Sequence, residues 1–170
     1  MKKIKINIFS ENIHPEAVLG LAIDEKKAIS VAKKLLKHYL ADQNIFTLSC
    51  LCEHDFNCIS FDILYCDNKK TLEINKEYRE KDYPADIITF AIFADSDEKF
   101  VFDGEINLGE IIISLDKVKE NSEEKKTSIE AELHFLISHG IMHLLGFDHQ
   151  TIEDYNFIME AQTSALELIK

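Results

Sequence analysis

The sequence has little glycine or proline and no long apolar run. Five glycines and two prolines occur among 170 residues, so no flexible Gly- or Pro-rich linker divides the chain. No internal repeat is apparent. The length suits one hydrophobic core, and we expect residues 1–170 to form a single domain. The longest apolar run, residues 87–94, is far shorter than the roughly 20 residues that a membrane-spanning helix needs.

Several catalytic signatures are also absent. The sequence has no G-x-x-x-x-G-K-[ST] phosphate loop and no G-x-S-x-G nucleophile elbow. Its five scattered glycines cannot form a dinucleotide-binding fingerprint. Residues 4–9 alternate apolar and polar side chains, which predicts a strand rather than the continuous apolar stretch of an export signal. We therefore expect a cytoplasmic protein with no membrane partner.

Positive charge is scarce, and it is unevenly placed. The formal net charge is −12, which argues against loose, nonspecific nucleic-acid binding, because such binding needs many phosphate contacts. Residues 69–81 nevertheless carry five basic groups against three acidic ones, whereas residues 95–105 carry five acidic groups against one lysine. An acidic protein with one basic face can still bind RNA locally.

The four cysteines do not follow a C-x-x-C spacing. We predict that Cys50, Cys52, Cys58 and Cys66 are reduced in the cytoplasm and serve as small buried apolar residues. A thiolate metal site is the alternative.

Hydrophobic periodicity predicts interleaved strands and helices. The class is therefore α+β, with an α/β-type mixed sheet flanked by helices. Turn residues at 54–57 predict a hairpin between two of the strands. The predicted strands are 4–9, 46–53, 59–66, 87–93 and 110–115, and the predicted helices are 24–41, 68–79, 116–126, 128–145 and 152–168.

Three histidines near the end of the clearest helix have the spacing of metal ligands. His139 and His143 are four residues apart, so their side chains share one helix face. Gly146 can take the positive φ that turns the chain out of the helix, which can bring His149 over the same face. Three neutral imidazoles suit one zinc ion per chain, although nickel, copper and iron stay open. Three protein ligands leave a fourth position for water, whose pKa zinc can lower to about 7.

The same spacing occurs in metzincin proteases, with one difference. Those enzymes carry glutamate, the general base, directly after the first histidine. This sequence has Gly140 there. A protease that works in the usual way is therefore disfavoured, although a metzincin-like hydrolase of another substrate stays an alternative.

Residues 139–149 resemble the signature of the YbeY family, bacterial endoribonucleases of rRNA maturation. The family pattern is roughly H-G-x-x-H-L-x-G-[YF]-D-H, and this segment satisfies every position. Further similarity lies in Asn75, Tyr78, Arg79, Asp82, Asp86 and Phe90, in residues 108–113, and in Met159 and Glu160. The sequence departs from the family's usual residues at Ala85, Thr89, Ala91 and Glu110.

The resemblance implies a function as well as a site. It implies a three-histidine zinc site and hydrolysis of single-stranded RNA, with a role in 16S rRNA 3′-end maturation and ribosome quality control. The implied partners are rRNA, the small ribosomal subunit and an Era-type GTPase. A non-catalytic ribosome assembly factor with a bound metal is a further alternative.

Arg79 is the only arginine in the chain, since all other basic residues except the histidines are lysines. A lone arginine in a lysine-rich protein indicates a need for the planar guanidinium, which binds phosphate in a bidentate manner. A surface or salt-bridge role is the alternative. The family motif favours the first interpretation, so we assign Arg79 as the candidate catalytic residue. Asp148 could orient a histidine or cap the turn, and it receives no catalytic role.

Overall fold

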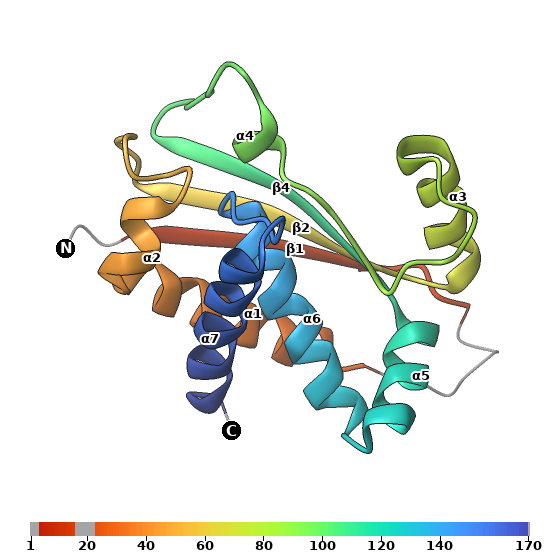
Figure 1. Ribbon diagram of the computed structural model, residues 1–170. Helices are drawn as coiled ribbons and strands as arrows, with labels where there is room; N and C mark the ends of the chain where they lie inside the picture. The colour runs from red at the N-terminus through yellow and green to blue at the C-terminus, as the bar shows by residue number, and fades with distance from the viewer. Residues whose placement is uncertain (1–3, 16–22, 170) are drawn as a thin grey trace.

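A four-stranded mixed sheet is the centre of the fold in the computed structural model, which describes residues 4–15 and 23–169 (Figure 1). The strand order is β1-β2-β4-β3, with β1, β2 and β4 parallel and β3 antiparallel at one edge. The strands are β1 (Lys5–Asn12), β2 (Cys58–Cys66), β3 (Ile87–Phe90) and β4 (Glu105–Ser114). The predicted α+β class with a mixed sheet is confirmed.

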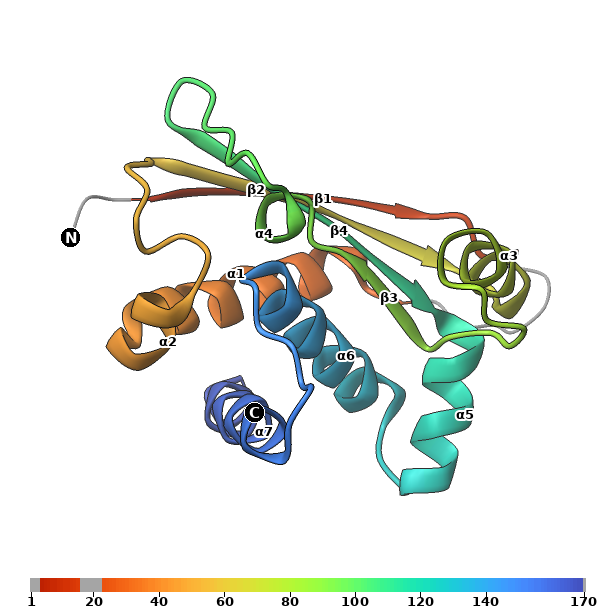
Figure 2. The same ribbon diagram turned by 45° about the horizontal axis from the view of Figure 1, so that its top comes forward.

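Helices cover one face of this sheet in two layers. Helices α1 and α6 pack on the sheet, and α7 packs against both of them from the outside (Figure 2). Helix α6 is therefore enclosed between the sheet and α7. Among the helices of the described residues, none is both long and apolar enough to cross a membrane. The helices are α1 (Glu25–Ala41), α2 (Gln43–Leu48), α3 (Asn68–Arg79), α4 (Ile92–Asp95), α5 (Leu115–Lys125), α6 (Ile129–Leu144) and α7 (Ile152–Glu167).

The predicted strand at 46–53, and with it the hairpin to 59–66, is wrong. Both edges of β2 are already paired, one with β1 and the other with β4, so no edge is open to a hairpin partner. The Asp42 side chain instead caps α2 by accepting from the backbone N–H groups of Asn44 and Ile45. After α2 the chain docks on the end of α6, where the Cys50 N–H donates to the Leu145 carbonyl at 2.9 Å.

Two further strand boundaries differ from the predictions. Strand β3 ends at Phe90, and residues 92–95 form the short helix α4 rather than more strand. Strand β4 begins at Glu105, five residues before the predicted start. Its first half alternates exposed Glu105 and Asn107 with buried Ile106 and Leu108. The two polar residues lie on the opposite face, which α3 covers only at the other end of β4, and they gave this segment the composition of a loop.

The cysteines divide into two groups, and all four are free thiols. Cys58 and Cys66 on β2 are buried, as predicted for small apolar residues. Cys52 is exposed and Cys50 is half-buried, because residues 46–53 are not a strand with one buried face. The single domain over residues 1–170 stays a prediction, since residues 1–3, 16–22 and 170 lie outside the described part of the chain.

Candidate metal centre

Helix α6 carries two of the three histidines and is anchored at both its start and its middle. At its N-terminus, the Ser128 hydroxyl accepts from the Ala131 N–H at 3.0 Å, which supplies the partner that a first-turn N–H lacks. In its middle, the buried hydroxyl groups of Ser138 and Tyr39 on α1 are 2.6 Å apart and hydrogen-bonded. These contacts fix the helix on which His139 and His143 lie.

Gly140 allows α6 to approach the sheet closely. A Cβ atom at this position would lie 2.8 Å from Cδ1 and 2.9 Å from Cγ2 of Ile111 on β4, closer than side-chain carbon atoms pack. Position 140 therefore faces the sheet, where a glutamate would meet the buried Ile111 side chain. Close packing of position 140 against Ile111 is therefore a structural reason why this chain has no metzincin-type glutamate there.

The end of α6 reverses the chain toward the two histidines. Gly146 has φ of +93°, and its N–H donates to the His143 carbonyl at 2.9 Å. The next N–H, of Phe147, donates to the Met142 carbonyl at 3.1 Å. This pair of bonds is a Schellman motif, in which glycine takes the left-handed position without a Cβ penalty. The reversal places His149 beside the helix face that carries His139 and His143, as the sequence predicted.

Asp148 stabilises this turn. Its two carboxylate oxygens accept from the His149 N–H at 2.8 Å and from the Gln150 side-chain amide at 3.0 Å. These two hydrogen bonds lower the pKa of Asp148 below its ordinary value, and the bond from Gln150 contributes most. Of the two roles considered from the sequence, the turn cap is the one with direct contacts.

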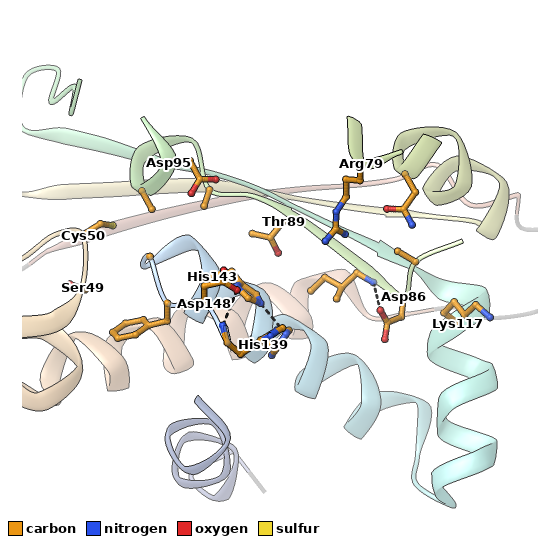
Figure 3. Close-up of a pocket in the computed structure, with 18 of the residues that line it drawn as sticks. Ser49, Cys50, Arg79, Asp86, Thr89, Asp95, Lys117, His139, His143 and Asp148 are labelled. Carbon is orange, nitrogen blue, oxygen red and sulfur yellow. Dashed lines mark hydrogen bonds between the residues drawn. The ribbon is translucent and has the colours of Figure 1, made fainter. Parts of the chain in front are cut away.

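The three imidazoles form one cluster. The Nε2 atoms of His139 and His143 are 3.0 Å apart (Figure 3), and the ring centroids of His149 lie 5.5 and 5.2 Å from those of His139 and His143. One ring nitrogen from each residue lies within 4.8 Å of the others. Within the described residues, this is the single group of three or more histidine, cysteine or carboxylate side chains gathered closely enough to hold an ion.

The chemistry of this cluster fits a metal ion. A tetrahedral zinc with bonds of about 2.0–2.1 Å separates two ligand nitrogens by about 3.3 Å, close to the observed 3.0 Å between His139 and His143. Burial, followed by the neighbouring His139 and His149, lowers the pKa of His143 to about 4. Burial likewise lowers the pKa of His139. At neutral pH both rings are therefore uncharged, which is the state that binds metal.

A cleft of about 850 Å³ opens over the cluster (Figure 3). His139 and His143 lie on one side of it, and Arg79 and Thr89 lie on the other (Figure 3). His149 also lines the cleft. The cleft thus joins the C-terminal end of α3 to the C-terminal end of α6. The structure places all four predicted site residues around one cavity.

Arg79 is the last residue of α3 and is exposed to solvent. Figure 3 shows its side chain directed from α3 toward the cleft. In residues 4–15 and 23–169, no carboxylate forms an ion pair with its guanidinium, whereas the nearby Lys76 pairs with Asp82 at 2.7 Å. The described structure therefore offers no salt bridge as the reason for this arginine, and its donors are available to a ligand.

Other residues of the cleft were not identified as site residues from the sequence. Cys50 lines it because residues 46–53 dock on α6 instead of joining the sheet. Asn121 on α5 also lines it, and its side-chain amide donates to Asp86 at 3.4 Å. Neither residue has a spacing to the histidines that a sequence pattern could detect, since tertiary packing alone brings them there.

The described fold and site define an α+β protein with a cluster of three histidines that could hold a metal ion. Residues 20–170 match the family model described as Endoribonuclease YbeY. The chain belongs to this family.

Individual relatives agree with this assignment. An endoribonuclease YbeY of Malacoplasma penetrans is 38% identical over 143 residues, which cover 84% of this chain and 85% of the relative. One from Oceanobacillus iheyensis is 42% identical over 105 residues, covering 60% of this chain and 68% of the relative. A solution structure of a Thermotoga maritima protein is similar in fold, with a TM-score of 0.56 and 22% identity over 95% of this chain and 87% of that one.

Proposed function

We propose that this protein is a metal-dependent endoribonuclease that cleaves single-stranded RNA. The observation that carries the proposal is the placement around one cleft of three histidines and an arginine that has no ion pair within the described part of the chain. His139, His143 and His149 would hold one divalent ion, with zinc the preferred metal. When bound, the ion would supply Lewis-acid activation of water and of a phosphate oxygen. The endoribonuclease names of the relatives supply the substrate class.

Arg79 has the properties required of a phosphate ligand. Its guanidinium is exposed at the cleft and free of carboxylate partners among the described residues. A planar fork of this kind can bind two phosphate oxygens and stabilise the negative charge that develops on them during cleavage. We therefore assign Arg79 as the catalytic cation of the proposed reaction.

The remaining charges of the cleft restrict how RNA can bind. Asp86, Asp95 and Asp148 also line it, and they repel phosphate groups. Lys117 lines it too, but its ammonium group is paired with Glu120. Binding is therefore favoured mainly for the few phosphates that lie beside Arg79 and the proposed ion. Such a site suits a short stretch of single strand, and it accords with the net charge of −12, which weakens sequence-independent binding elsewhere.

We extend the proposal to 16S rRNA 3′-end maturation and ribosome quality control, with the small ribosomal subunit and an Era-type GTPase as partners. This extension rests on the family resemblance. The test in cells is the length of the 16S rRNA 3′ end when His143→Ala replaces the wild type. Mature ends at the normal level would contradict the extension and favour a non-catalytic assembly role.

The test of the activity itself compares purified wild type with His143→Ala and His54→Ala. His54 contacts Phe93 edge-on and is not one of the clustered histidines, so it is the matched control. We expect wild type and His54→Ala to cleave single-stranded RNA, and His143→Ala or chelator-treated protein to lose cleavage. Cleavage of a peptide library with none of RNA would point to another metallohydrolase.

A further inference from the structure

Gln162 on α7 is a fully buried polar side chain that touches the histidine cluster from behind. Its exposed fraction is 0%, and its Oε1 lies 3.0 Å from Nδ1 of His139. Its amide nitrogen lies 3.4 Å from the backbone carbonyl of Phe135, one turn earlier on α6. Ile158 and Ala165, its neighbours on the same face of α7, are also buried, and they are apolar.

The Phe135 carbonyl determines which way the Gln162 amide points. A carbonyl oxygen can only accept a hydrogen bond, so the amide NH₂ group must face Phe135. The Gln162 oxygen must then face Nδ1 of His139, and it can only accept. Nδ1 of His139 therefore carries the proton, and Nε2 of the neutral ring has a free lone pair.

That lone pair is directed at the cluster. Nε2 of His139 is the nitrogen that lies 3.0 Å from Nε2 of His143, so the atom left unprotonated is also the atom nearest the other histidine. The ring of Phe135 stacks parallel to that of His139, with 6.3 Å between centroids and 11° between planes. The stacking limits tilting of the ring, and the Gln162 bond limits its rotation within the plane.

We infer that Gln162 is a positioning residue of the metal centre, which selects Nε2 of His139 as the metal-binding nitrogen and fixes the ring for it. The inference rests on the metal site of the proposed function. It assigns α7 a role in the site, although α7 contributes no candidate ligand itself. Partners of this kind, behind a metal-binding histidine, typically change metal affinity by about 10–100-fold when removed.

The first test is the tautomer of His139 in metal-free wild type, read from long-range proton–nitrogen NMR correlations at about pH 8. We expect the proton on Nδ1. A proton on Nε2 would overturn the inference. This readout requires no metal, no RNA and no variant, so it does not depend on the activity.

The second test is zinc affinity, measured by competition with a chromophoric chelator. Gln162→Met keeps a similar length but removes the acceptor, and we expect it to bind zinc about 10–100-fold more weakly. Gln162→Glu keeps an acceptor oxygen toward Nδ1 of His139 but loses the donor to the Phe135 carbonyl, so it should bind zinc more tightly than Gln162→Met. Tyr39→Phe is the control for a lost buried hydrogen bond on α6, since it removes the bond to Ser138, and it should leave the affinity unchanged.

The outcomes separate the two proposals. Equal zinc affinities in wild type and Gln162→Met would overturn the role of Gln162 and leave the metal site standing. A matching loss in Tyr39→Phe would show that general loosening of α6 explains the effect, which also overturns it. Failure of the wild type to bind zinc, nickel, copper or iron would instead overturn the metal site itself.

Discussion

Replacing Gly140 by alanine tests whether α6 lies against the sheet as described. The added Cβ would meet Cδ1, Cγ2 and Cγ1 of Ile111 at 2.8, 2.9 and 3.0 Å. Ile111 is fully buried, so its side chain cannot move aside into solvent. Overpacking of this kind costs about 1–3 kcal/mol, while the higher helix propensity of alanine offsets up to about 1 kcal/mol. We expect Gly140→Ala to lower the free energy of unfolding by up to about 2 kcal/mol.

A double-mutant cycle makes this prediction independent of helix propensity. All three of the close atoms belong to the Ile111 side chain beyond Cβ, so Ile111→Ala removes each of them. Alone, Ile111→Ala should cost about 2–5 kcal/mol. In the Gly140→Ala background it should cost about 1–3 kcal/mol less, because the substitution relieves the clash and the new methyl group fills part of the space.

The assay is urea unfolding of the four proteins at 25 °C, monitored by circular dichroism. Additivity within about 0.5 kcal/mol would show that a side chain at position 140 does not contact Ile111, since residues in contact are expected to couple. Gly140→Glu extends the test to chemistry, because the structure gives a side chain at this position no route to the histidines. Zinc-dependent peptide hydrolysis by a folded Gly140→Glu protein would contradict the described packing.

Three further predictions concern the cleft and the sheet. Arg79→Lys keeps the charge but loses the planar guanidinium, so single-turnover RNA cleavage should slow about 10–1000-fold while the melting temperature barely moves. Equal cleavage rates would exclude a catalytic role for Arg79. A collapse in melting temperature would show a structural role instead. Tyr83 lines the cleft with 54% of its surface exposed, so Tyr83→Ala should raise KM for single-stranded RNA about 5–150-fold through lost base stacking. Tyr83→Phe should stay near wild type, and so should the control Tyr78→Ala, because the Tyr78 ring packs edge-on against Phe90. A similar rise in KM for Tyr78→Ala would remove the support for stacking. Burial is the main cause that raises the pKa of Glu110, followed by the charges of Asp62, its partner on β2, and Glu11. The folded state therefore favours the protonated acid, and stability falls as pH rises from the unfolded pKa through the raised folded pKa. Glu110→Gln should melt above wild type at pH 7 and lose that advantage near pH 4, whereas an equal difference in melting temperature at both pH values would contradict this.

The convergence of the three histidines could be predicted from the sequence because its geometry is local. The four-residue step from His139 to His143 and the glycine three residues later are properties of one helix and its end, and the structure has the Schellman turn that this pattern requires. Gln162 lies 13 residues beyond His149 on another helix. Its contact with His139 arises from the packing of α7 on α6, and no sequence spacing encodes it.

The errors in the predicted strands have the same origin. Residues 46–53 have β-rich composition, but β2 has no free edge because β1 and β4 occupy both. The sheet order is set by nonlocal contacts, so the sequence of one segment cannot reveal it. Conversely, Glu105 and Asn107 made the start of β4 resemble a loop, since one face of the sheet is uncovered there and tolerates polar residues.

The proposed function requires that one metal ion on His139, His143 and His149 enables RNA cleavage. A zinc titration of metal-free protein during cleavage of single-stranded RNA tests this requirement directly. We expect no cleavage without metal, a linear rise in rate with added zinc, and a break at about one ion per chain. His143→Ala should show neither the rise nor the break. Full cleavage by the metal-free protein, or an unchanged titration for His143→Ala, would contradict the claim.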